Sequence, residues 1–204
     1  APTRELAKQI DTTIKAFVEG SHLRVRLVVG GVSIAGQVKR LSKGSDILVA
    51  TPGRLIDLLN RNAVRLDDTK FLVLDEADQM LDLGFIHSLR KIADLLPDNR
   101  QTMLFSATMP KKMDELASSY LRDPIRVEAA PSGKVADKIT QSIHFVSKQD
   151  KNRLLTDLLA RHKNELAIVF SRTKHGAEKL LKTIVNSGCS AVSIHGNKSQ
   201  AQRE

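Results

Sequence analysis

Three carboxylates stand together in the middle of the chain, at Asp75, Glu76 and Asp78, directly after the apolar run Phe71–Leu74. An unbroken apolar run of this length is typical of a strand with both faces covered, as in a parallel sheet. Ligands of such sheets bind at the carboxyl ends of the strands. We therefore expect the three carboxylates at the ligand-binding edge of a sheet.

Each of the first two carboxylates is suited to one step of phosphate chemistry. Mg²⁺ is usually held by one or two carboxylates together with substrate phosphates, and Asp75 is the candidate for that contact. Glu76 could accept a proton from an attacking water molecule. An apolar strand that ends in Asp-Glu has the form of a Walker B element. Taken alone, the same residues fit an acidic helix N-terminus equally well, because free N–H groups and the helix dipole stabilise Asp there.

The tetrapeptide Asp75-Glu76-Ala77-Asp78 spells the motif that gives the DEAD-box RNA helicases their name. Further motifs of that family accompany it in the family's order: PTRELA at 2–7, Gly30-Gly31, TPGR at 51–54, SAT at 106–108, IVFSRTKHGAEKL from Ile168 and IHGNKSQAQRE from Ile194. The chain therefore resembles this family along nearly its whole length. The sequences PTRELAKQI and LDLGF resemble those of the bacterial RhlE-type members most.

The resemblance implies a role for each matching residue. Asp75 matches the carboxylate linked to Mg²⁺ through water, and Glu76 matches the one that activates the attacking water. Asp78 matches the acid that joins this site to SAT, where Ser106 and Thr108 match the segment that couples nucleotide state to strand separation. The residues that match contacts to the RNA backbone are Thr3, Arg4, Gly31, Thr51, Gly53, Arg54, Gln200 and Arg203.

Several of these residues also have an ordinary structural explanation. Ser106 and Thr108 fit a hydroxyl-rich turn after a strand. Thr51 and Gly53 fit the start of a helix, and this explanation is compatible with RNA binding because free N–H groups at a helix start bind phosphate.

The net charge of +9 and the pI near 9.8 suggest a polyanionic partner. Basic residues outnumber acidic ones in 1–65 and 129–204, which hold the RNA-binding motifs, whereas acidic residues outnumber basic ones in 66–128. Aromatic residues make up only 3% of the chain, with no Trp. This scarcity disfavours base stacking and favours sequence-independent contacts to the RNA backbone.

Other partners and cofactors have little support in the sequence. No apolar run approaches the roughly 18 residues that a membrane span needs, so we expect no membrane contact. Cys189 is the only cysteine, which excludes an intrachain disulfide and fits a reducing, cytoplasmic compartment. The six His residues lack the spacing of zinc ligands.

The elements that must position these motifs alternate between strands and helices, which predicts parallel βαβ units. We expect strands at 24–30, 46–51, 71–74, 101–106 and 125–128, and again at 139–146, 166–170 and 191–194. Apolar residues at helical spacing predict helices between them, and Ser199 with Gln202 forms a capping box that opens a last helix. The fold class is therefore α/β: a RecA-like parallel-sheet domain at 1–128, a linker at 129–138, and the start of a second RecA-like domain at 139–204.

A phosphate-cradling loop is missing from the chain. Residues 31–38, GVSIAGQV, have the two glycines of such a loop but carry Gln37 and Val38 where the Lys and the hydroxyl residue belong. In the family, this loop precedes PTRELA and the arginine finger follows the last motif seen here. We therefore expect an internal fragment, which by itself does not turn over ATP.

The resemblance implies an ATP-dependent RNA helicase that uses ATP and Mg²⁺ to close two RecA-like domains and locally unwind short RNA duplexes. One alternative is a nucleic-acid clamp without catalysis, against which the intact Asp75, Glu76 and SAT argue for the parent protein. A DNA-directed helicase is disfavoured by the DEAD spelling. A metabolic dinucleotide-binding enzyme is disfavoured by the absence of G-x-G-x-x-G.

Overall fold

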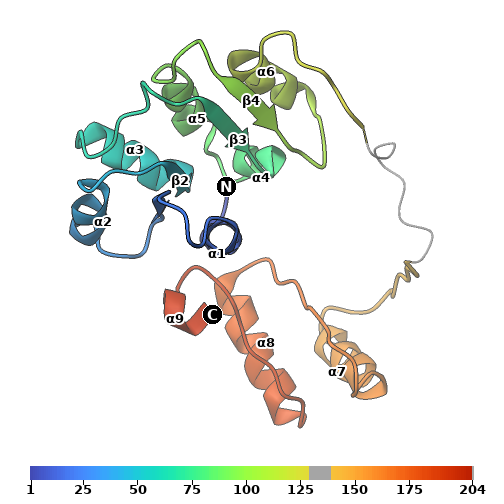
Figure 1. The fold of residues 1–204 in the computed structure, drawn as a ribbon. Helices are drawn as coiled ribbons and strands as arrows, with labels where there is room; N and C mark the ends of the chain where they lie inside the picture. Colours follow the sequence, from blue (N-terminus) through green and yellow to red (C-terminus); the bar gives the residue numbers. More distant parts are fainter. Residues whose placement is uncertain (129–138, 204) are drawn as a thin grey trace. The chain divides into compact units, whose positions relative to one another are not determined.

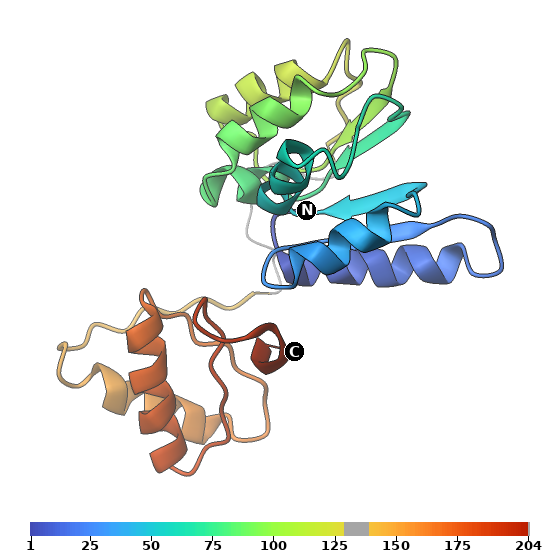
Figure 2. The same ribbon diagram turned by 90° about the vertical axis from the view of Figure 1, so that its left-hand side faces the viewer.

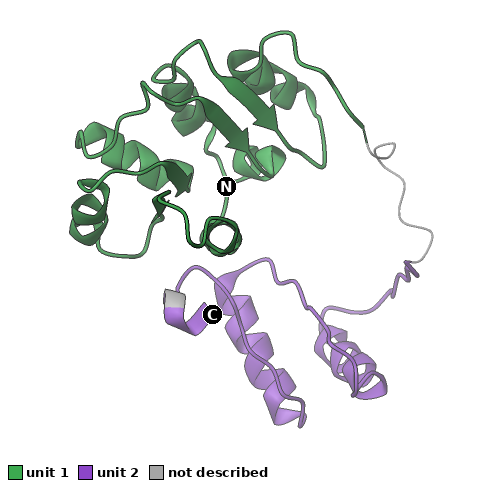
Figure 3. Cartoon of the chain, viewed as in Figure 1, with its two compact units in different colours: residues 1–134 green, residues 135–204 purple. Residues whose placement is uncertain are grey.

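The chain divides into two compact units, Ala1–Lys134 and Val135–Glu204, shown in Figure 3. The structure, a computed structural model, describes residues 1–128 and 139–203. The predicted linker at 129–138 lies outside the described residues.

Helices and strands alternate through unit 1 (Figure 1). The elements are α1 (Arg4–Phe17), β1 (Val25–Val28), α2 (Ile34–Leu41), β2 (Ile47–Ala50), α3 (Pro52–Asn60), β3 (Phe71–Leu74), α4 (Ala77–Asp82), α5 (Ile86–Ala93), β4 (Gln101–Leu104) and α6 (Lys111–Tyr120). β1 pairs with β2 and β3 pairs with β4, both in parallel. The predicted α/β class with parallel strands is confirmed, although the strands form two separate two-stranded sheets.

The sheet of β1 and β2 is covered on both faces (Figure 2). On one face Val25 and Val49 pack with Ala7 of α1, whose apolar residues recur at helical spacing as predicted. On the other face Val28 packs with Leu41 of α2 and Leu58 of α3. Apolar side chains therefore pack on both faces of this sheet.

The sheet of β3 and β4 is covered on one face only. Leu72, Leu74 and Leu104 pack into the core formed by α4, α5 and α6. Phe71 and Val73 point to the other face, where they are 69% and 49% exposed. The prediction that both faces of this strand are covered is wrong for the described residues, because α4, α5 and α6 all pack against the Leu72–Leu74 face.

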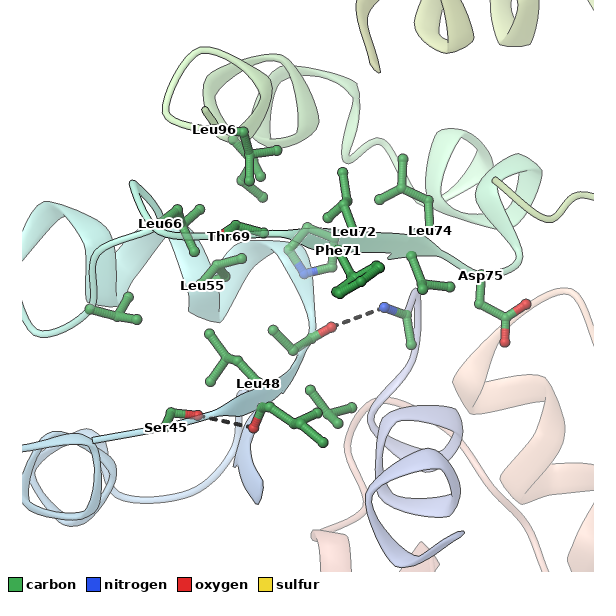
Figure 4. Close-up of a pocket in the computed structure, with 18 of the residues that line it drawn as sticks. Ser45, Leu48, Leu55, Leu66, Thr69, Phe71, Leu72, Leu74, Asp75 and Leu96 are labelled. Carbon is green, nitrogen blue, oxygen red and sulfur yellow. Dashed lines mark hydrogen bonds between the residues drawn. The ribbon is translucent and has the colours of Figure 1, made fainter. Parts of the chain in front are cut away.

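A cleft of about 940 Å³ separates the two sheets, between β2 and β3 (Figure 4). Its walls are mainly apolar side chains, among them Leu48, Leu55 and Phe71. The backbone nitrogen of Ala1 donates a hydrogen bond of 2.9 Å to the carbonyl of Ala50 inside it. Asp75 lies at one end of this cleft (Figure 4).

Unit 2 consists of α7 (Lys151–Arg161), α8 (Lys174–Asn186), α9 (Gln200–Arg203) and the segments between them. α7 contacts α8, and Ile184 is the one buried apolar side chain among the described residues of this unit. No helix in the described part of the chain is long and apolar enough to cross a membrane.

Four predicted strands are wrong: 125–128 in unit 1, and 139–146, 166–170 and 191–194 in unit 2 have no regular strand structure. A strand persists only when its N–H and C=O groups bond to a neighbour about 4.7–4.9 Å away. The apolar residues of these segments are present, yet Phe145, Leu166 and Phe170 are exposed rather than packed on a sheet. The pattern predicted strands, but among the described residues these segments have no pairing partner.

Substitution of Val by Thr in the two sheets tests this difference in coverage. Val28 in β1 is 1% exposed, so we expect Val28→Thr to lower the free energy of unfolding by about 1–3 kcal/mol, because a hydroxyl is buried. Val73→Thr in β3 keeps the β-branched shape on an exposed face and should change it by less than about 0.5 kcal/mol. Chemical denaturation measures both. Equal losses would show that the Val73 face is covered.

Candidate functional site

The loops that follow β3 and β4 lie side by side, because Leu74 is the register partner of Leu104 in the parallel pair. The N–H of Phe105 donates to the carbonyl of Leu74 at 2.8 Å, and the N–H of Ala77 donates to the carbonyl of Phe105 at 3.0 Å. These backbone bonds hold the DEAD segment against the SAT segment at the carboxyl edge of the sheet.

Asp78 connects the two loops through its side chain. Its Oδ2 accepts hydrogen bonds from the N–H of Thr108 at 2.9 Å and from the Thr108 hydroxyl at 2.8 Å. The Ser106 hydroxyl accepts from the N–H of Asp78 at 3.3 Å and donates to the Thr108 carbonyl at 2.7 Å. The structure thus brings Asp78, Ser106 and Thr108 into one hydrogen-bonded network.

This network keeps the Asp78 carboxyl ionised. Partial burial by itself raises the pKa of Asp78, but hydrogen bonds from the Thr108 hydroxyl, from the N–H groups of Gln79 and Thr108, and from Ser106 outweigh it. The pKa therefore lies below the ordinary value for Asp. A charged carboxylate accepts stronger hydrogen bonds than a neutral one, so the hydrogen bonds to Asp78 are strong at neutral pH.

Asp75 and Glu76 lie at the end of β3, before α4. Asp75 is partly buried, and its Oδ1 accepts the N–H of Glu76 at 3.0 Å. Glu76 is exposed and has a left-handed backbone, with φ 51° and ψ 51°. A side chain in this region costs on the order of 1 kcal/mol and is found at functional sites whose surroundings hold it. Here the hydrogen bond of Ala77 to Phe105 holds it.

Around the loop after β1, three of the predicted RNA-binding motifs come together. Arg4 of α1 lies over Gly30 and Gly31, so close that a side chain at Gly31 would collide with its guanidinium. Gly31 also has a φ of +78°, which favours glycine. The Arg54 side chain, 13% exposed, donates to the carbonyl of Val32 at 3.1 Å. Arg4 and Arg54 thus both contact the loop that contains Gly31, and these contacts also stabilise the loop.

The two predicted threonines have structural roles as well. Thr3 is the N-cap of α1, where its hydroxyl oxygen accepts the N–H of Leu6 at 3.2 Å. Thr51 is the buried N-cap residue of α3, and its N–H donates to the carbonyl of Val28 at 3.1 Å. A contact from either hydroxyl to RNA would come in addition to these roles.

Gly53 has no such structural requirement. It lies in the first turn of α3, and a Cβ placed there would meet Phe85 Cε1 at 3.7 Å, which is an ordinary contact. The first-turn N–H groups of a helix have no partner within the helix. The missing side chain therefore leaves room for an outside group to reach this turn.

Residues 31–38 do not form a phosphate-cradling loop. Gly36 and Gln37 belong to α2, and the buried Gln37 amide donates to the carbonyl of Val29 at 3.0 Å. This confirms that Gln37 does not stand in for the lysine of such a loop.

The remaining predicted residues, Gln200 and Arg203, belong to α9 in unit 2. The predicted capping box at the start of α9 is confirmed in part, because the N–H of Ser199 donates to Oε1 of Gln202 at 2.9 Å. Sequence reasoning missed the backbone groups of Phe105 and Val32, since backbone contacts leave no residue-type signature.

Two family descriptions match the chain. Residues 1–116 match the DEAD/DEAH box helicase family, and residues 150–204 match the helicase conserved C-terminal domain. The two matches contain the DEAD and SAT segments and α9, respectively.

Solved structures of similar proteins also match. A DEAD box protein from the hyperthermophile Methanococcus jannaschii is 36% identical with a TM-score of 0.61, over all of this chain and 54% of that protein. A hypothetical ATP-dependent RNA helicase from Sulfolobus tokodaii is 35% identical with a TM-score of 0.56, over 60% of this chain and 37% of that protein. The chain thus spans about half or less of the length of these relatives.

Replacement of Asp78 by Asn tests the network that joins the two loops. We expect Asp78→Asn to lower the free energy of unfolding at pH 7 by about 1–2 kcal/mol, because charge-assisted hydrogen bonds are lost. A carboxyl with a lowered pKa in the folded state stabilises above its unfolded pKa, and this stabilisation is lost as the pH falls through the folded pKa.

The difference between Asp78→Asn and the original chain should therefore shrink below about pH 4. Asp82→Asn, the same change at an exposed position of α4, is the control. Denaturation curves at neutral and acidic pH measure both variants. A pH-independent difference, or an equal loss in Asp82→Asn, would contradict the role of Asp78.

Proposed function

The chain belongs to the DEAD/DEAH box helicase family, and from this premise we propose that it is part of an ATP-dependent RNA helicase that locally unwinds short RNA duplexes. The observation that carries the proposal is the hydrogen-bonded network of Asp78, Ser106 and Thr108, which joins the acidic end of β3 to the loop after β4. We further propose RecA-like domains at 1–128 and 139–204, a cytoplasmic location, and a place among the RhlE-type members, which the wording of PTRELAKQI and LDLGF supports.

ATP hydrolysis is proposed at the end of β3. The described residues contain no group of three or more acidic, His or Cys side chains that could hold a metal. Mg²⁺ takes few protein ligands and draws the rest from water and phosphates, so Asp75 would hold it through water. Bound Mg²⁺ neutralises charge on the phosphates. The exposed Glu76 is proposed to accept a proton from the attacking water.

The Asp78 network supports a role in coupling. Because Thr108 bonds through both its N–H and its hydroxyl to one carboxylate oxygen, movement of the DEAD segment displaces the loop after β4. Ser106 and Thr108 would in this way transmit the nucleotide state to the RNA-binding part of the protein.

RNA binding in unit 1 is proposed at the loop after β1 and the start of α3. Arg4 and Arg54 supply positive charge on either side of Gly31, and Gly53 leaves the α3 N–H groups accessible. Thr3 and Thr51 are proposed to add hydroxyl contacts, and Gln200 and Arg203 a second set in unit 2. Contacts of this kind bind phosphate and position a strand without reading its sequence.

A second candidate function for the 204 residues taken alone is that of an RNA clamp without ATP turnover. Gln37 supports it, because its buried amide bonds to the carbonyl of Val29 and does not take the place of a phosphate-binding lysine. With no phosphate-cradling loop at 31–38, we propose that these residues by themselves bind RNA as a clamp and do not turn over ATP. The helicase activity is proposed for the longer protein. A DNA-directed helicase would be distinguished by equal affinity for DNA, since discrimination depends on the RNA 2′-hydroxyl.

Gly53→Ala tests the RNA contact at α3. Ala is a better helix former than Gly by about 1 kcal/mol, and the new Cβ has ordinary packing, so stability should be unchanged or higher. RNA affinity should fall, because the Cβ occupies the path to the free N–H groups. Loss of one phosphate contact corresponds to about a fivefold loss in affinity near 0.1 M salt.

Gly36→Ala is the matched control, because Gly36 also lies in a helix and a Cβ there meets nothing closer than 3.8 Å. Fluorescence anisotropy of a labelled, unstructured RNA oligomer with the 204-residue chain measures the affinities. If Gly53→Ala binds RNA as tightly as Gly36→Ala, the proposed contact at α3 is wrong.

A further inference from the structure

Glu178 of α8 gathers three hydrogen-bond donors from the segment that leads to α9. Its Oε1 accepts the Ser193 hydroxyl at 2.6 Å, His195 Nε2 at 2.7 Å and Lys198 Nζ at 2.7 Å. The side chains of His195 and Lys198 are only 12% and 25% exposed. One carboxylate oxygen therefore connects α8 to residues 193–198.

The contacts of His195 define its tautomer. Nδ1 accepts the N–H of Asn197 at 3.3 Å, and in a neutral imidazole one nitrogen accepts while the other donates. Nε2 therefore carries the proton that is donated to Glu178. In this way the ring links the backbone of Asn197 to α8.

The Glu178 carboxyl remains ionised in this arrangement. The hydrogen bond from Lys198, followed by those from Ser193 and His195, lowers the pKa of Glu178 to about 2. An ionised carboxylate can only accept hydrogen bonds, which suits a group that receives three donors.

A second bond from the same face of α8 holds the turn. Lys174, which lies one helical turn before Glu178, donates from Nζ to Oδ1 of Asn197 at 3.1 Å. The N–H of Lys198 donates to the carbonyl of His195 at 3.0 Å and closes the turn at 195–198. Ser199 follows and α9 begins at the next residue. The position of the α9 start is thus set by α8.

We propose that Glu178 is a positioning residue for the nucleic-acid contact of α9. It holds the turn at 195–198 from which α9, with Gln200 and Arg203, begins. The inference rests on the proposed function, because it assigns to Glu178 the placement of two residues proposed to bind RNA. Glu178 does not itself contact the RNA, since a carboxylate repels phosphate.

Because Glu178 is charged, the direction of the change in RNA affinity on its replacement tests the proposal. Glu178→Gln removes one negative charge from a chain that binds a polyanion, so on charge alone RNA affinity should rise. Asp157→Asn makes the same charge change at an exposed residue of α7 and serves as the control. If Glu178 acts by positioning α9, its replacement weakens binding instead.

The test compares RNA affinities of the 204-residue chain by anisotropy at several salt concentrations. We expect Glu178→Gln to weaken binding by up to about fivefold near 0.1 M salt and to flatten the slope of log K against log salt by at most about 0.7, as for one lost phosphate contact. Asp157→Asn should bind as tightly as the original chain or more tightly. In an Arg203→Ala background, Glu178→Gln should have a smaller effect than in the original chain, because only the Gln200 contact is left to lose.

Hydrogen exchange provides the second readout. Amides of residues 195–203 should exchange faster in Glu178→Gln, while those within α8 keep their protection. If α8 also loses protection, Glu178→Gln has disturbed the helix itself, and a second variant is needed. Ser193→Ala removes one hydrogen-bond donor to Glu178 without a change in charge. If Ser193→Ala does not weaken RNA binding, the inference is wrong.

The possible failures are distinguishable. If Arg203→Ala weakens RNA binding but Glu178→Gln behaves like Asp157→Asn, or if the effects of Glu178→Gln and Arg203→Ala add in full, the positioning role is overturned and the proposed function stands. If Arg203→Ala and Gln200→Ala both leave binding unchanged, the proposed contact of α9 is wrong, and the role proposed for Glu178 is wrong with it.

Discussion

The bond between Asp78 and Thr108 is the interaction on which the candidate catalytic end of unit 1 depends. Parallel pairing of β3 with β4 places two loops at one edge of the sheet, but pairing alone leaves the loops free to separate. The Asp78 carboxylate, ionised and bonded twice to Thr108, joins them. The neighbouring backbone bond from Ala77 to Phe105 holds Glu76 in its left-handed conformation. Hydrogen bonds of the neighbouring residues thus fix the backbone of Glu76, the residue proposed as the proton acceptor.

The proposed RNA-binding residues show how one side chain can serve both fold and function. Arg4 fills the space that Gly30 and Gly31 leave open, and Arg54 bonds to the carbonyl of Val32. Loss of either arginine would therefore disturb the loop as well as remove positive charge. Gly53 is different, because nothing within the protein requires a glycine there. It is the position at which the proposed RNA contact can be tested with little disturbance to the fold.

The sequence predicted the strands and helices of unit 1 well, apart from the strand at 125–128, because those patterns are local and their partners are present. It also predicted that Asp78 joins SAT, through the family resemblance. It failed for Phe71 and Val73, since an apolar run does not show which face a helix will cover. It failed for the strands of unit 2, because pairing depends on segments far apart in sequence. The Glu178 contacts were not predicted for the same reason: Ser193 and Lys198 lie 15 and more residues away, at no characteristic spacing.

The rate of RNA-stimulated ATP hydrolysis by a longer protein that contains this chain is the most direct measure of whether the end of β3 is a hydrolytic site. Glu76→Gln keeps the size of the side chain but cannot accept a proton from water. It should retain ATP and RNA binding while hydrolysis falls by roughly 10²- to 10⁴-fold. Asp82→Asn, which also replaces a carboxylate by an amide, at an exposed position six residues along the chain, should hydrolyse ATP at the original rate. A Glu76→Gln protein that hydrolyses ATP as fast as the original would contradict the assignment of Glu76 and, with it, the catalytic role proposed for this edge of the sheet.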